Sequence, residues 1–168
     1  MERILITGSS AAGKTTLAKE LSKKLNLRLI HLDKYYWQPN WIRPELLKWR
    51  EIVSTLVEED KWIIEGNYGC TFDIRFQRAT MIIHFEIHPF ICLYRAIKRT
   101  ISTRDLVRED MAKGCSERLN LETYKYILSY PKKHNQKVYQ SKKNFFSGEF
   151  VVIKNDKDLE NLYLKLKI

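Results

Sequence analysis

The sequence has 168 residues, which suits one domain with a single core and leaves no room for a second folded domain. Hydrophobic residues make up 44% of it, which excludes an intrinsically disordered chain. The formal net charge of +10 suits anionic partners such as nucleotides, phosphorylated metabolites or nucleic acid, although a basic surface without a specific target would account for it equally well.

The cysteine pattern and the N-terminus bear on where the protein works. Cys70, Cys92 and Cys115 lie far apart and lack metal-ligand spacing, which argues against both a disulfide framework and a zinc site. The N-terminal residues show no secretory signal pattern, and no apolar run is long enough to cross a bilayer. We therefore expect a cytoplasmic protein with no membrane partner, either a monomer or a homodimer.

In chain order, short apolar runs alternate with segments of helical periodicity. The expected strands are 3–6, 29–32, 62–64, 81–87 and 150–153, and the expected helices are 14–25, 44–59, one from 89 onward, 122–130 and one from 157 onward. Strands that alternate with helices favour a parallel sheet covered on both faces. The polar segment from about 100 to 119 is expected to be a mobile insertion, and 1–168 a single domain.

The first strand is followed by a glycine-rich loop that matches the pattern G-x-x-x-x-G-K-[ST]. The loop consists of Gly8, Ser9, Ser10, Ala11, Ala12, Gly13, Lys14, Thr15 and Thr16. In this motif the backbone N–H groups and the helix N-terminus hold phosphates, the lysine reaches the β- and γ-phosphates, and the Thr15 hydroxyl binds Mg²⁺. A plain glycine turn would not require Lys14, so the motif predicts ATP and Mg²⁺ as cofactors.

The loop alone does not name a reaction, because many enzyme classes share it. No N-K-x-D motif of guanine-binding proteins follows, and no extended hydrophobic strand ends in Asp-Glu as in DNA-driven ATPases. The remaining polar residues follow the expected strands, where open α/β sheets bind ligands. This pattern favours a compact phosphotransferase.

Three carboxylates lie at the ends of expected strands. Asp33 is the candidate that orients or deprotonates the acceptor hydroxyl, although it could simply cap the next turn. Glu65 is the candidate that holds Mg²⁺ through water, although it could be a solvated strand-end charge, and Glu86 is the reserve candidate.

The candidates for the acceptor pocket follow the second and third strands. Tyr36 and Trp37, with their aromatic neighbours, offer flat faces for stacking, although such dense aromatics more often form a packed loop. The other candidates are Asn67, Tyr68 and Arg75. The strand histidines His31 and His84 are expected to be core residues.

Several motifs together resemble a known family. They are His31-Leu32-Asp33, Trp37-x-Pro39-x-Trp41, Glu65-Gly66-Asn67-Tyr68, Asp73-x-Arg75 and Arg108-x-Asp110-Met111-x-x-Gly114-Cys115-x-Glu117-Arg118. The chain is similar over nearly its whole length to the DNA topology modulation protein (FlaR-like) family, a branch of adenylate-kinase-related P-loop proteins. One departure is Glu65, where the family more often has aspartate.

The resemblance implies an α/β fold of the three-layer P-loop NTPase type. It implies a five-stranded parallel sheet of order 2-3-1-4-5, ATP on the loop, and an arginine-bearing lid at about 100–119. In adenylate-kinase-like proteins, a pair spaced like Arg95 and Arg99 packs on adenine and contacts phosphate, and Arg108 and Arg118 resemble the second pair of the lid. A solvated basic helix face is the alternative for all four.

The sequence therefore predicts an ATP-dependent, Mg²⁺-requiring kinase. Lys14, Asp33, Arg99, Arg108 and Arg118 would act in catalysis on a small-molecule acceptor such as a nucleotide or nucleoside. The alternative is a nucleic-acid-associated ATP-binding regulator without metabolite kinase activity. Nucleic acid is the less favoured partner, because no helix-turn-helix or basic zipper is readable.

Overall fold

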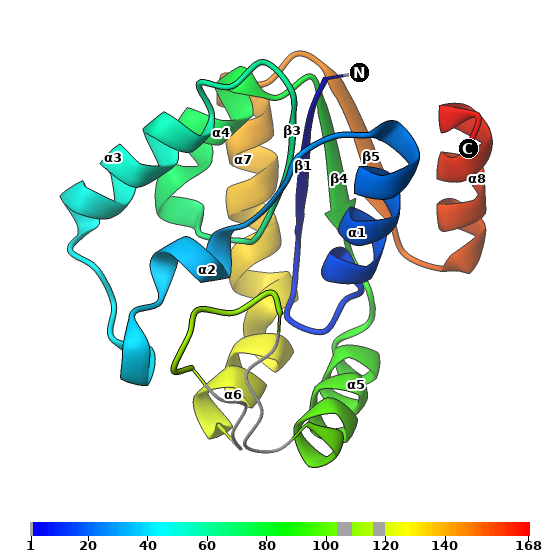
Figure 1. The fold of residues 1–168 in the computed structure, drawn as a ribbon. Helices are drawn as coiled ribbons and strands as arrows, with labels where there is room; N and C mark the ends of the chain where they lie inside the picture. Colours follow the sequence, from blue (N-terminus) through cyan, green and yellow to red (C-terminus); the bar gives the residue numbers. More distant parts are fainter. Residues whose placement is uncertain (1, 104–108, 116–119) are drawn as a thin grey trace.

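The computed structural model describes residues 2–103, 109–115 and 120–168 (Figure 1). Its parallel strands form one sheet in the order β2-β3-β1-β4-β5, which confirms the predicted order. The strands are β1 (Arg3–Gly8), β2 (Leu29–His31), β3 (Trp62–Glu65), β4 (Met81–Phe85) and β5 (Glu149–Ile153). β1 lies between β3 and β4, so the chain crosses from β1 toward β2 and β3 on one side and toward β4 and β5 on the other. The loop after β1 lies at this switch point, where open α/β sheets bind ligands.

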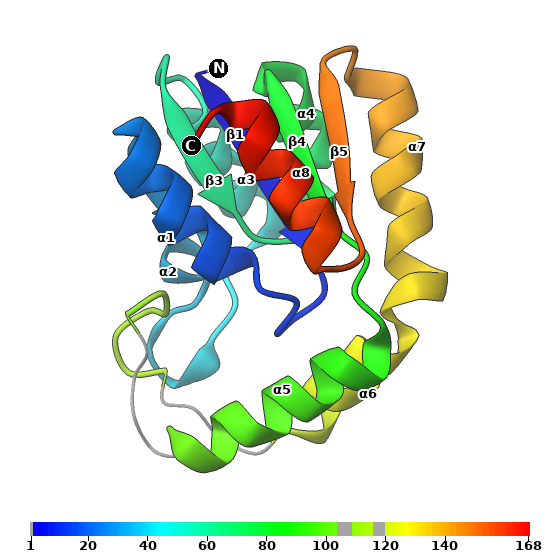
Figure 2. The same ribbon diagram turned by 90° about the vertical axis from the view of Figure 1, so that its right-hand side faces the viewer.

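Helices cover both faces of the sheet. They are α1 (Lys14–Leu25), α2 (Leu32–Tyr36), α3 (Leu46–Leu56), α4 (Phe72–Arg78), α5 (Pro89–Ser102), α6 (Leu121–Tyr130), α7 (Gln136–Phe145) and α8 (Asp156–Leu166). Helices α1 and α8 lie on one face and α3, α4 and α7 on the other, while α5 and α6 lie beyond the carboxyl ends of the strands (Figures 1 and 2). The 3-10 turns η1 (Pro39–Trp41) and η2 (Gly69–Thr71) and the π-helical turn η3 (Pro131–Asn135) connect these elements.

The buried side chains form a core on each face of the sheet. Ile4 and Ile6 of β1 pack with α1 and α8, whereas Leu5 between them packs with α3 and α4. Successive side chains of a strand point to opposite faces, so a strand covered on both faces reads as a continuous apolar run. The apolar run of β1 thus positions the loop that follows it.

The structure differs from the sequence expectations in local elements. The second strand ends at His31, because Leu32 begins the short helix α2 and Asp33 lies in its first turn. Helix α4 was not predicted, because seven residues are too few to show helical periodicity, although Phe72 and Phe76 are both buried on one side of it. The helix expected over 44–59 spans only Leu46–Leu56.

The described part of the expected lid is packed against the rest of the domain. Residues 104–108 and 116–119, and with them Arg108 and Arg118, lie outside the described residues. Within 109–115, Met111, Ala112 and Cys115 are buried against Trp37 and Trp41. This stretch is therefore a docked segment and not a free insertion. Over the ranges that the structure describes, none of the helices has the length and apolar character that crossing a membrane requires.

Candidate active site

The glycine-rich loop between β1 and α1 has the backbone geometry that its glycines permit. Gly8 has φ +143° and Gly13 φ +106°, values that side chains rarely allow. A Cβ on Gly8 would lie 2.7 Å from the Cβ of Phe85 in β4, so the loop is also held close to the neighbouring strand. Helix α1 starts at Lys14, and its free N–H groups therefore face the space that the loop encloses.

Lys14 lies inside the curve of this loop. Its Nζ donates a hydrogen bond to the Ser9 carbonyl oxygen at 2.7 Å. Burial lowers the pKa of the Lys14 amine, and the negative charges of Glu65 and Asp33 oppose that effect. The structure thus brings Asp33 and Glu65, which follow different strands, into the electrostatic neighbourhood of the loop lysine.

The Thr15 hydroxyl lies between two carboxylates. It is 3.1 Å from Glu65 Oε1 and 3.4 Å from Asp110 Oδ2. His31 donates through Nδ1 to the same Glu65 oxygen at 2.9 Å, because a carboxylate can only accept. His31 is therefore a buried residue, as expected, and it also fixes the orientation of Glu65.

This oxygen set fits Mg²⁺ and does not fit a transition metal. A hydroxyl and carboxylates are hard ligands, and Mg²⁺ keeps several waters and binds nucleotide phosphates alongside one or two protein carboxylates. Across 2–103, 109–115 and 120–168, no group of three or more His, Cys, Asp or Glu side chains could hold a metal by itself. A metal at Thr15 would thus depend on phosphate oxygens.

Sequence reasoning did not assign a role to Asp110. Its side chain is buried, with 8% exposed, and the neighbouring Glu109 pairs with Lys19 of α1 at 2.8 Å. The docked segment is anchored on its other side, where the Asn40 N–H donates to the Gly114 carbonyl at 3.2 Å. The available signal was the position of Asp110 inside a family-like motif, which gives no hint that it reaches Thr15.

A cavity of about 550 Å³ lies beside the loop. Residues Ala11–Leu17 line one side, and Arg95, Arg99 and Asp110 line another. The remaining wall includes Asn155, Leu159 and Tyr163, which follow β5. We call this the larger cavity. Its charged lining consists of three cations, Lys14, Arg95 and Arg99, and two carboxylates, Asp110 and Asp156. The predicted arginine pair of α5 thus lies beside the loop.

On the other side, Asp33 and Tyr68 are hydrogen-bonded. The Tyr68 hydroxyl donates to Asp33 Oδ1 at 2.5 Å. Burial, followed by the negative charge of Asp33, raises the pKa of Tyr68, so the phenol stays neutral and remains a donor. Tyr36 packs on Tyr68 with ring centroids 4.4 Å apart, which places it in the wall behind Asp33.

The predicted acceptor residues are not all placed alike. Trp37 packs against the docked segment, and its ring centroid lies 5.2 Å from that of Trp41. Its position is therefore that of a packed loop, the alternative that the sequence left open. The Asn67 side chain donates to the Tyr126 hydroxyl at 2.6 Å and accepts from the Tyr130 hydroxyl at 2.8 Å. These two tyrosines of α6 were missed, since nothing in an isolated helix shows which loop it faces.

Arg75 does not reach the acceptor space. Its side chain is 0% exposed, and it donates to the carbonyl oxygens of Gly66, Asn67 and Tyr68 at 3.0, 3.0 and 2.8 Å. The expectation that Arg75 contacts an acceptor directly is therefore corrected. Because this buried guanidinium donates to three consecutive carbonyl groups, it stabilises the conformation of the loop after β3.

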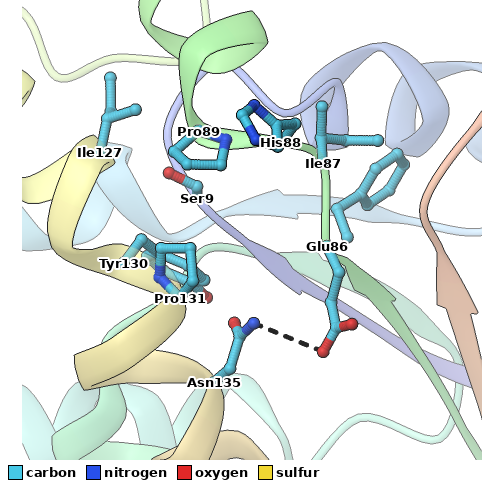
Figure 3. Close-up of a pocket in the computed structure, with 10 residues that line it drawn as sticks. Ser9, Glu86, Ile87, His88, Pro89, Ile127, Tyr130, Pro131 and Asn135 are labelled. Carbon is cyan, nitrogen blue, oxygen red and sulfur yellow. Dashed lines mark hydrogen bonds between the residues drawn. The ribbon is translucent and has the colours of Figure 1, made fainter.

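Glu86 also lies away from Thr15. It accepts from the Asn135 amide at 3.4 Å, as Figure 3 shows. It also accepts from the Tyr139 hydroxyl at 2.6 Å. Of the two candidate carboxylates, Glu65 and not Glu86 therefore lies beside the Thr15 hydroxyl. Glu86 instead lines a second cavity of about 230 Å³, which we call the smaller cavity.

Comparisons with known proteins bear on the fold. No protein-family model and no curated protein matches the chain. Among solved structures it is similar to shikimate kinase from Bacteroides thetaiotaomicron, with 18% identity over 99% of both chains and a TM-score of 0.61.

Two further solved structures cover nearly the whole chain. Shikimate kinase from Acinetobacter baumannii in complex with shikimate has 15% identity over 99% of this chain and 94% of that chain, with a TM-score of 0.65. Deoxyadenosine kinase from M. mycoides with bound dATP has 16% identity over 100% of both chains, with a TM-score of 0.51. These likenesses confirm the predicted three-layer P-loop NTPase fold.

Proposed function

We propose that the chain is an ATP-dependent, Mg²⁺-requiring kinase that phosphorylates a hydroxyl group of a small molecule in the cytoplasm. The observation that carries the proposal is the convergence on Lys14 of two carboxylates from different strand ends, Glu65 and Asp33. Glu65 accepts from the Thr15 hydroxyl, whereas the hydrogen bond described for Asp33 is with Tyr68. This division suits a reaction that needs one acid group for a metal and another for an acceptor.

The residues of the larger cavity fit a magnesium nucleotide. The loop N–H groups and Lys14 would hold the phosphates, and Thr15 with Glu65 and Asp110 would hold the metal and its waters. When bound, Mg·ATP supplies the phosphoryl group and the metal neutralises charge on its oxygens. Arg95 and Arg99 add positive charge from α5, and Arg108 and Arg118 are proposed to do the same from the lid.

Asp33 is the proposed acceptor base. As the acceptor oxygen forms its bond to the γ-phosphorus, the bond between that phosphorus and the bridging oxygen of ADP breaks, and the hydroxyl proton passes to the Asp33 carboxylate. The Tyr68 hydroxyl holds this carboxylate in one orientation. Asp33 would thus act on the acceptor without holding the nucleotide.

A screen for acceptor-dependent ADP formation tests this function. Purified protein with Mg·ATP is assayed against nucleosides, nucleotides, sugars and amino alcohols, with Asp33→Asn as the inactive partner. We expect at least one compound to stimulate ADP formation well above the rate without acceptor, and only in the wild type. A slow, acceptor-independent rate that is equal in both proteins would contradict the proposal.

A second candidate function rests on surface charge. Lys132, Lys133, Lys137 and Lys143 are all exposed along η3 and α7. Exposed lysines in these elements favour binding to nucleic acid, as the family resemblance would imply for a regulator of DNA topology. Duplex DNA binding that weakens steeply with salt, and that is lost when these lysines are replaced by glutamine, would support this candidate.

A further inference from the structure

The smaller cavity adjoins the phosphate-binding loop on the side away from the larger cavity. Ser9, the second residue of the loop, lines it together with the end of β4, the start of α5, α6 and η3 (Figure 3). Phe85 and Ile87 line both cavities, so the two are separated only by the loop and the end of β4. A molecule in the smaller cavity would therefore lie next to the phosphates held by the loop.

Ser9 offers an unused polar group to this cavity. The side chain is 4% exposed, and its Oγ has no hydrogen-bond partner among the residues that the structure describes. In Figure 3 the hydroxyl lies below Pro89 and points toward α6, the helix that carries Ile127. A buried hydroxyl without a partner carries a desolvation cost that a ligand hydroxyl or amine would remove.

Among the described residues that line the smaller cavity, the one fixed charge is the Glu86 carboxylate, since none of them is lysine or arginine. Lys154 does not line the cavity; its Nζ lies 3.7 Å from Glu86 Oε2 with 63% of its side chain exposed, so it offsets this charge only weakly. His88 also lines the cavity, and it is exposed. The N-terminus of α5 also borders the cavity, but Pro89, its first residue, has no N–H to offer an anion.

The remaining polar groups of the smaller cavity are neutral. Asn135 and Tyr130 line it, and Tyr130 joins it to Asn67 on the Asp33 side through their hydrogen bond. The other walls are apolar, among them Ile127 and Pro131. A cavity of about 230 Å³ is smaller than the roughly 300 Å³ at which drug-sized ligand pockets begin, so it suits a group about the size of one sugar ring.

We propose that the smaller cavity binds the part of the phosphoryl acceptor remote from its reacting hydroxyl, which would reach Asp33 outside the cavity lining, and that this acceptor is an uncharged or positively charged hydroxyl compound, not a phosphate or carboxylate. The inference rests on the proposed kinase function and names its substrate class. Ser9 Oγ and Asn135 bind polar groups of the acceptor, and Glu86 excludes anions by charge repulsion.

Binding measurements test this class without requiring turnover. The protein is saturated with Mg·ADP to fill the larger cavity, and matched pairs are then titrated by NMR: adenosine against AMP, cytidine against CMP, and glucosamine against glucosamine 6-phosphate. Backbone amide shifts of Ser9 and Asn135 report where each compound binds. The variant is Glu86→Gln. The matched control is Glu149→Gln, because Glu149 is the first residue of β5 and does not line the smaller cavity.

We expect an uncharged or cationic member to bind with shifts at Ser9 and Asn135, and its phosphorylated partner to bind at least about tenfold more weakly, the scale of one like-charge contact near a protein surface. Glu86→Gln should reduce the ratio of the two dissociation constants, phosphorylated over unphosphorylated, severalfold. Glu149→Gln should leave this ratio unchanged. Equal or tighter binding of the anionic partners, or no shift at Ser9 and Asn135 with any compound, overturns the inference.

The two proposals can fail separately. Selective binding of uncharged compounds without phosphoryl transfer to any of them would leave the inference standing and refute the kinase. Phosphoryl transfer to a nucleoside monophosphate or to a carboxylate in preference to its uncharged counterpart would support the kinase and refute the inference.

Discussion

The two cavities beside the phosphate-binding loop differ in charge more than in position. The larger one is lined by three cations, Lys14, Arg95 and Arg99, and two carboxylates, whereas the smaller one is lined by the carboxylate of Glu86 and no lysine or arginine among the described residues. Yet Phe85 and Ile87 belong to the walls of both. Under the proposed function, the larger cavity would take the polyanionic nucleotide and the smaller one a molecule without negative charge.

The strongest test of the cationic side is Lys14→Ala. Charge that neutralises a transferring phosphoryl group is worth about 10³–10⁵ in rate, so turnover should fall by that order and ATP binding should weaken as well. Calorimetry with ATP and an ADP-release assay measure the two effects. The control is Lys23→Ala on the exposed end of α1, and unchanged ATP affinity in Lys14→Ala would refute the nucleotide assignment.

The proposed acceptor base, which lies outside the lining of the smaller cavity, is tested by Asp33→Asn. Loss of a general base lowers kcat by roughly 10²–10⁴, while the affinity for ATP should stay within about twofold, because the hydrogen bond described for Asp33 is with Tyr68 and not with the loop. Steady-state kinetics with the acceptor and calorimetry with ATP separate these effects. Asp60→Asn, at an exposed position, is the control. A variant with full activity would place the base elsewhere.

Asp110 tests whether the docked segment belongs to the nucleotide side. Residues that orient a metal and its waters typically account for about 10–100-fold in metal affinity, so Asp110→Asn should weaken Mn²⁺ binding to the protein–ADP complex by that factor. Electron paramagnetic resonance of bound Mn²⁺ measures it without turnover. Glu109→Gln removes only the surface pair with Lys19 and should leave the affinity unchanged. Equal Mn²⁺ affinities in all three proteins would remove Asp110 from the metal position.

The smallest expected effect is that of Tyr130→Phe. It removes the hydroxyl that donates to Asn67 at 2.8 Å, and one such hydrogen bond contributes about 0.5–1.5 kcal/mol. The KM for the acceptor should rise severalfold and the KM for ATP should not change. Tyr94→Phe, at an exposed position on α5, is the control. If only the KM for ATP rose, Tyr130 would act on nucleotide binding, and its assignment to the acceptor cavity would be wrong.

The two cavities also differ in how far the sequence predicts them. The phosphate-binding loop is contiguous, and its glycines, lysine and threonine have fixed spacing, so Gly8 to Thr16 and the parallel sheet around it are readable from residue order. The smaller cavity brings together Ser9, Glu86 and Asn135 from three distant segments. No local sequence pattern predicts that these three residues lie close together, because their proximity depends on how α6 and η3 pack against the end of β4.

The same limit explains the misplaced and missed residues. Arg75 follows a loop of polar residues, and only the structure shows that its guanidinium lies beneath that loop and holds its carbonyl groups. Asp110 is distant in sequence from Thr15, and the packing of Met111 and Cys115 on Trp37 and Trp41 is what brings it there. Long-range packing is a property of the whole chain, so it does not appear in motif spacing.

Phosphorus-31 NMR of the reaction mixture tests most directly the central claim that the protein transfers the γ-phosphoryl group of ATP to a hydroxyl compound. Wild-type protein is incubated with Mg·ATP and a mixture of nucleosides, sugars and amino alcohols, beside Asp33→Asn. The account predicts a new phosphate-ester resonance that grows in step with ADP in the wild type and is absent in the variant. Inorganic phosphate as the sole product, formed at the same rate with and without the mixture, would contradict it.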